Sequence, residues 1–157
     1  MAIEIGKPAP DFSLFDTDKK KTSPADFKDK HVLILFFPQA FTSTCTKELC
    51  AVRDDISRYS NVNAQVIGIS VDSVFTLRRY KEDQHYNFPL LSDFNKEVSV
   101  AYDSLYPEWI LEMKGVSKRS AFIIDKKGVI QYAEVIENAG DTPDFGRINQ
   151  TLASLAL

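Results

Sequence analysis

Continuous apolar segments indicate where this chain forms strands. Residues 31–37 and 64–71 are rich in branched and aromatic side chains and are too short for helices, which predicts strands buried on both faces. A third apolar segment covers residues 121–124, and residues 129–135 follow it after a turn sequence that ends at a glycine. That spacing is typical of a β-hairpin. Residues 12–16 alternate weakly and lead into a turn, so short strands are expected there too.

Helical periodicity occupies the gaps between these strands. After Cys45, four apolar residues recur at steps of four and three, which places them on one face of a helix: Leu49, Val52, Ile56 and Tyr59. Further helices are expected over residues 73–85, 96–105 and 144–155. Strands that alternate with helices and end in a hairpin predict an α/β fold, with a mixed sheet covered by helices on both faces. This order fits the thioredoxin-like arrangement but does not single it out.

Composition adds the expected domain organisation. The chain has 157 residues, of which 44% are hydrophobic and 26% are charged, as is usual for a globular domain. No repeat or linker divides it, so we expect a single domain over residues 1–157. A net charge of −3 and a pI near 5.4 disfavour binding to nucleic acid or to anionic lipid. The basic run at residues 19–21 lies in an expected turn and is interpreted as a solvated loop.

The cellular compartment can also be predicted. The first residues contain no basic region followed by an apolar stretch, so they do not resemble a secretory signal. The longest apolar run, residues 32–37, is too short to cross a bilayer. We therefore expect a cytoplasmic protein with no membrane association. In that compartment, its two cysteines are expected to be reduced and to serve in catalysis or metal binding.

The candidate chemistry is concentrated around Cys45. A buried strand stops at Pro38, a loop rich in hydroxyl side chains follows, and a helix starts close to Cys45. In the first turn of a helix, unpaired backbone N–H groups and the positive end of the dipole favour the thiolate. A thiolate is a nucleophile, and peroxide oxygen is among its electrophiles. Thr42 could bond either the thiolate or an incoming peroxide through its hydroxyl.

The spacing Pro38-x-x-x-Thr42-x-x-Cys45 resembles the active-site motif of peroxiredoxins. Two later segments add to the resemblance. Residues 88–93, with the sequence FPLLSD, look like a segment common in that family. Residues 119–125, with the sequence RSAFIID, are similar to the strand that carries the family's catalytic arginine.

The resemblance covers residues 6–137 and is most similar to the alkyl hydroperoxide reductase E branch. It implies a thioredoxin-like fold and a thiol-dependent peroxidase that reduces hydrogen peroxide and organic hydroperoxides in antioxidant defence. It also implies a homodimer, which no residue pattern in this chain shows. Trp109 lies in an aromatic loop that we assign to packing or to a dimer surface.

The resemblance also implies roles for individual residues. Cys45 would be the peroxidatic cysteine, oxidised to sulfenic acid as the peroxide O–O bond breaks. Thr42 and Arg119 would hold the two peroxide oxygens and stabilise the charge that moves onto the leaving oxygen. Pro38 would shield the thiolate. Glu48 matches a position that often orients the arginine, and the alternative is an ordinary first-turn acid that stabilises the helix.

Two roles remain open for Cys50. Bacterioferritin-comigratory-type peroxiredoxins carry a resolving cysteine five residues after the peroxidatic one, which is the spacing of Cys45 and Cys50. On an intact helix this spacing separates the Cα atoms by about 8.6 Å, whereas a disulfide needs roughly 7 Å or less. Resolution by Cys50 would therefore require the helix start to unwind. In the alternative, Cys50 is a passive thiol on the polar side, beside Arg53 and Ser57, and an external thiol completes the cycle.

Other functions are weaker interpretations of the same residues. The two cysteines, with His31 and His85, make a poor zinc set. A disulfide reductase of this fold would have its two cysteines separated by two residues. A redox sensor or chaperone on the same fold is the remaining alternative. No metal, flavin or nucleotide motif is present, so no cofactor is expected. The expected partners are a peroxide and a reducing thiol, with thioredoxin as the default reductant if an internal disulfide forms.

Overall fold

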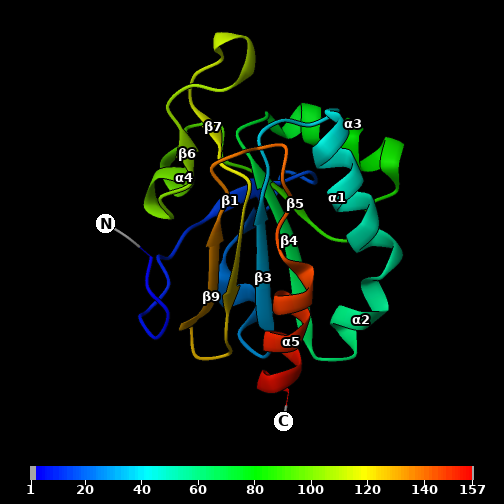
Figure 1. Ribbon diagram of the computed structural model, residues 1–157. Helices are drawn as coiled ribbons and strands as arrows, with labels where there is room; N and C mark the ends of the chain where they lie inside the picture. Colours follow the sequence, from blue (N-terminus) through cyan, green and yellow to red (C-terminus); the bar gives the residue numbers. More distant parts are fainter. Residues whose placement is uncertain (1–2, 157) are drawn as a thin grey trace.

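A computed structural model describes residues 3–156 of the chain. Its centre is a seven-stranded mixed sheet in the order β2-β1-β5-β4-β3-β8-β9 (Figure 1). The strands are β1 Leu14–Asp16, β2 Lys21–Thr22, β3 His31–Phe36, β4 Ala64–Ser70, β5 Leu90–Ser92, β8 Ser120–Ile124 and β9 Ile130–Val135. Strands β3, β4 and β5 are parallel, whereas β8 is antiparallel to β3 and forms a hairpin with β9. The strands and the hairpin expected from the apolar segments are therefore confirmed.

Four helices cover one face of the sheet: α1 Ser43–Asp54, α2 Ile56–Ser60, α3 Val74–Gln84 and α5 Phe145–Leu155. Successive side chains of β3 point to alternate faces of the sheet, so only every second one contacts these helices. Leu33 and Leu35 belong to the cluster that also contains Leu49 of α1 and Leu152 of α5. Because successive side chains of a strand point to opposite faces, their neighbours along β3 belong to the other cluster.

The second face is covered by shorter elements. Val32, Ile34 and Phe36 pack there with Val98 of α4, the helix Glu97–Ala101. Phe27, at the end of the 3₁₀ helix η1 Pro24–Phe27, packs against the same cluster. The expectation of helices on both faces is therefore confirmed, with the longer helices on the face that carries Cys45.

Two predicted helices have different boundaries in the structure. The periodic face that starts at Cys45 is divided between α1 and α2, because Asp55 leaves the helical region with φ −117° and ψ 25°. Tyr59 is nevertheless buried in the same core as Leu49. The helix expected over residues 96–105 ends at Ala101, because Asp103 takes a positive φ of 52°. A helix continues only while its residues keep α-helical φ and ψ values. The backbone angles of Asp55 and Asp103 therefore each end a helix.

A small ribbon projects beyond the sheet. Strands β6 Leu105–Tyr106 and β7 Val116–Ser117 pair antiparallel, and the 3₁₀ helix η2 Ile110–Glu112 lies in the loop between them. Trp109 packs against a small cluster that includes Tyr106, while Leu111 is 86% exposed at the tip of the loop. The lysines at residues 19–21 are exposed, as expected. Across residues 3–156, no helix combines the length and apolar character needed to cross a membrane.

Candidate active site

Cys45 lies in the first turn of α1, next to the end of the central strand. The chain leaves β3 at Phe36, passes the buried Pro38, and enters α1 after Thr42, whose extended backbone (φ −94°, ψ 155°) forms the N-cap. The first helical hydrogen bond runs from Thr46 N to Thr42 O at 3.0 Å. Cys45 is therefore close to the unpaired N–H groups and the positive end of the helix dipole, where an anion is stabilised.

Asp72 holds the loop that leads into α1. Its Oδ2 accepts hydrogen bonds from the Ala40 backbone N at 2.8 Å and from the Ser70 hydroxyl at 2.6 Å. Burial raises the pKa of this carboxyl, and the two hydrogen bonds oppose that change. Asp72 was not expected at the site from the sequence. Its position directly after a buried strand indicated that it lies at the end of the sheet. Its contact with Ala40, 32 residues away, cannot be predicted from the sequence.

Arg119 joins Cys45 to Glu48. Its Nη2 donates to Cys45 Sγ at 3.2 Å, and its Nη1 donates to Glu48 Oε1 at 2.8 Å. Its Nε donates to the Ala139 carbonyl oxygen at 3.1 Å, so the planar guanidinium is held on three sides. Pairing of Phe36 with Ser120 in the β3–β8 ladder brings Arg119, the preceding residue, to the end of β3 beside the start of α1. The structure thus brings together three residues from two distant segments.

All three of these side chains are removed from solvent. Cys45 is 0% exposed, Arg119 is 1% exposed and Glu48 is 3% exposed. Burial raises the pKa of Glu48 to about 7, although the neighbouring Arg119 opposes this change. Burial by itself would lower the pKa of Arg119, but the adjacent Cys45 and Glu48 raise it above its ordinary value. The guanidinium therefore supplies a permanent positive charge next to the sulfur.

The other two residues of the motif lie close by in the chain but have different contacts. Thr42 is half-buried, and its Oγ1 donates to the Gln39 carbonyl oxygen at 2.8 Å. Its lone pairs can still accept a hydrogen bond from an O–H group. Pro38 is buried and offers no backbone N–H that would need a partner.

Cys50 lies beside Arg53, as the passive interpretation expected, but it is less exposed than a residue on the polar side of α1 would be. It is half-buried, packs against the core cluster, and its Sγ lies 3.5 Å from Gln84 Oε1 and 3.9 Å from the Tyr86 hydroxyl. Cys50 is half-buried because the end of α3 packs against this side of α1. Both cysteines are free thiols, and α1 is continuous between them.

A group of aromatic side chains supports the same stretch of α1 and was not recognised in the sequence. The Tyr80 hydroxyl lies 2.9 Å from Thr46 Oγ1, and the Tyr80 ring contacts Phe41 and Tyr86 with centroid distances of 4.9 and 5.1 Å. These contacts attach the first turn of α1 to α3.

No grouping of three or more His, Cys, Asp or Glu side chains suited to a metal ion occurs within residues 3–156. His31 is buried at the start of β3, and burial lowers its pKa. His85 is exposed and ends α3 in the left-handed conformation, with φ 54°.

Comparisons with known proteins agree with this geometry. The AhpC/TSA family model matches residues 5–133, a span that contains Cys45, Glu48 and Arg119. The putative peroxiredoxin ycf42 of Porphyra purpurea is 35% identical, with 98% of this chain and 77% of the relative aligned. The mitochondrial thioredoxin-dependent peroxide reductase of Drosophila melanogaster is 32% identical, over 83% of this chain and 58% of that protein.

A solved structure shows the same fold over nearly the full length. Peroxidoxin BcpB from Mycobacterium tuberculosis has a TM-score of 0.82 and 27% identity, and the match covers 98% of this chain and 96% of that one. The expected thioredoxin-like fold is therefore confirmed. With more than half of the chain matched by the family model and a relative at 35% identity, this chain belongs to the AhpC/TSA family and is a peroxiredoxin.

Proposed function

We propose that this peroxiredoxin reduces hydrogen peroxide and organic hydroperoxides with Cys45 as the attacking sulfur. One observation carries the proposal: a buried guanidinium, Arg119 Nη2, lies 3.2 Å from Cys45 Sγ at the start of a helix. A positive charge and a helix N-terminus both favour the thiolate, which is the nucleophilic form of cysteine.

The chemical step follows from these positions. The Cys45 thiolate attacks the terminal oxygen of the peroxide, an S–O bond forms, and the O–O bond breaks. The sulfur becomes sulfenic acid, and the departing hydroxide or alkoxide takes up one proton to leave as water or alcohol. Arg119 can stabilise the charge on the departing oxygen, and Thr42 can accept a hydrogen bond from the peroxide. Pro38 keeps water from one side of the loop.

The sulfenic acid is then reduced by a thiol, and two routes remain proposals. If Cys50 attacks it, a disulfide forms and water leaves, but α1 must first unwind because it is continuous from Ser43 to Asp54. Such unwinding would break the contacts of Cys50 with Gln84 and Tyr86. Otherwise an external thiol attacks directly. We propose thioredoxin as the reductant, because the Drosophila relative is named for that dependence.

The mass of the intact protein tests this function. After one equivalent of hydrogen peroxide and thiol blocking, a loss of two hydrogens with both cysteines unlabelled indicates a disulfide between Cys45 and Cys50. A gain of one oxygen with Cys50 labelled indicates reduction by an external thiol. The matched variant Cys50→Ser should gain one oxygen in either case. A Cys45 thiol that stays reduced after minutes would contradict the proposal.

We also propose that the protein is a homodimer. Exposed apolar side chains follow the carboxyl-terminal ends of β3 and β4 or lie in the projecting loop: Phe41, Phe75, Ile110 and Leu111. A protein that exposes a group of large apolar residues commonly covers them with a partner. Sedimentation velocity should give twice the mass of the chain, and Leu111→Asp should shift the protein toward monomer. A wild-type protein that sediments as a monomer at all concentrations would refute this.

The cellular location is likewise a proposal. The chain has only two cysteines, and both lie on the continuous helix α1, where they cannot form a structural disulfide. Extracellular domains more commonly contain such disulfides, which supports a cytoplasmic protein, and fractionation of cells that express the natural chain would test it.

A further inference from the structure

Two acidic groups share one buried cation in the active site. Arg119 donates to Cys45 Sγ and to Glu48 Oε1, and all three side chains are almost fully buried. If both acids were ionised, the site would carry one uncompensated negative charge away from water. Burial of an unpaired charge is costly, so interacting acids of this kind hold a proton between them.

The surroundings indicate which of the two holds the proton. Cys45 lies in the first turn of α1, where the helix stabilises an anion. Glu48 lies one turn further along, and its Oε2 is buried without a hydrogen-bond partner among the described residues. A carboxylate would leave a charged oxygen unpaired there, whereas a neutral carboxyl would not.

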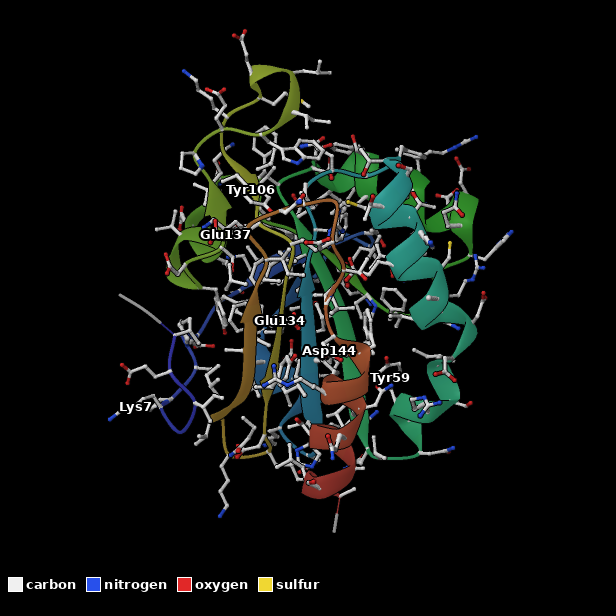
Figure 2. All side chains as sticks on the ribbon, in the orientation of Figure 1. Lys7, Tyr59, Tyr106, Glu134, Glu137 and Asp144 are labelled. Atoms are coloured by element: carbon white, nitrogen blue, oxygen red, sulfur yellow. The ribbon has the colours of Figure 1, made fainter. Side chains whose placement is uncertain are left out.

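Besides Arg119, two titratable groups in the described part of the chain interact with Glu48. Glu134 on β9 faces it with a negative charge and raises its pKa. Tyr59 on α2 interacts with Glu48, and burial raises the pKa of Tyr59 to about 12, so this residue stays neutral. Figure 2 shows Glu134 near the start of α5, where its Oε1 accepts from the Asp144 backbone N at 2.9 Å and from the Tyr132 hydroxyl at 2.7 Å. Two hydrogen bonds to Oε1 thus hold the Glu134 carboxylate in place.

We propose that Glu48 holds one proton while Cys45 is a thiolate, and gives it up when Cys45 is oxidised. This inference rests on the proposed function. The thiolate attacks the peroxide, the sulfur gains an OH group, and the departing hydroxide or alkoxide receives a proton equivalent to the one that Glu48 loses. The products are a neutral sulfenic acid, water or alcohol, and the Glu48 carboxylate. The negative charge moves from sulfur to Glu48, and Arg119 remains paired throughout.

This proposal goes further than a positioning role for Glu48. A carboxylate that only orients Arg119 would be ionised before and after oxidation, and the proton for the leaving oxygen would come from solvent. A neutral Glu48 supplies that proton within the site. Burial raises the pKa of Glu48 to about 7, so the neutral form is populated below that pH while the folded protein is intact.

Infrared difference spectroscopy and proton counting test the proposal on the full-length enzyme. In the reduced protein, the ultraviolet absorbance of the thiolate and the carbonyl band of a carboxylic acid should be present together. After one equivalent of hydrogen peroxide, that band should disappear from the wild type. It should be absent from Glu48→Gln throughout, and it should persist in reduced Glu137→Gln, the matched control, whose exposed carboxylate pairs with Lys118 and does not act on Glu48.

A pH indicator gives an independent measurement that a purely structural role would not change. At a pH where the thiolate absorbance is complete and the carbonyl band is present, wild type and Glu137→Gln should take up no proton from solvent per Cys45 oxidised. Glu48→Gln should take up one. A wild type that takes up one proton, or a carbonyl band that is absent or unchanged by oxidation, overturns the inference. If mass spectrometry shows that Cys45 is not oxidised, the proposed function fails instead.

Discussion

Replacement of Cys45 with serine should lower the rate of peroxide reduction by about 10⁶-fold, the scale observed when an enzyme loses its nucleophile. A serine hydroxyl stays protonated where a thiol in this position can ionise, and it lacks the polarisable sulfur that attacks the O–O bond. The side chain is fully buried and serine is similar in size, so the helix start should remain intact. Peroxide consumption with a thiol reductant, followed over time, measures the loss.

Cys50→Ser is the matched control for this variant, because it changes the same atoms one and a half turns further along α1. Its first oxidation should proceed at the wild-type rate, since Cys50 contacts Gln84 and Tyr86 and not Arg119. Only the later reduction step should depend on it. If Cys45→Ser kept more than a small fraction of the activity while Cys50→Ser lost it, the roles of the two sulfurs would have to be exchanged.

Replacement of Arg119 with methionine should lower the rate constant of sulfenic acid formation by about 10²–10³-fold. This is the usual cost of removing one preorganised hydrogen-bond donor that stabilises charge in a transition state. The change removes the bond to Cys45 Sγ and also the partner of Glu48. Quenched-flow mixing with peroxide, with mass analysis of the product, measures the oxidation step without the reductant.

Arg119→Lys separates charge from geometry. Lysine keeps the positive charge but cannot reach the sulfur, Glu48 and the Ala139 carbonyl with one planar group. Its rate should therefore lie between those of the wild type and the methionine variant. Thermal unfolding of both variants checks that the fold survives. An Arg119→Met rate within a factor of about two of the wild type, in a folded protein, would remove Arg119 from the mechanism.

Much of the fold could be predicted because the relevant information is local. The segment that became β3 is buried at every position and apolar after His31, and a strand in the middle of a sheet is the environment that requires this. The hairpin of β8 and β9 could be predicted from the turn that ends at Gly128, which adopts a positive φ of 83°. Strand positions were therefore predicted more accurately than helix boundaries.

The helix boundaries depended on contacts that are distant in sequence or specific to a turn. The helix expected over residues 96–105 begins where the Asp93 carboxylate accepts from the backbone N of Val98 and Ser99. It ends early because Asp103 takes a positive φ. Beyond Asp103 the chain turns to pair β6 with β7. Apolar spacing alone cannot distinguish such an end from a continuing helix, because Tyr102 and Leu105 continue the apolar spacing beyond it.

The position of Cys45 at a helix start, after a buried strand and a proline, could be predicted because neighbouring residues decide it. The residues that contact Cys45 in the folded protein could be predicted only through family resemblance. Arg119 lies 74 residues away, and the β3–β8 register brings its guanidinium to the sulfur. A register is settled by packing across the whole sheet, since a shift of one residue would turn every side chain to the other face. The tertiary structure alone therefore decided that Cys45 and Glu48 share one buried positive charge.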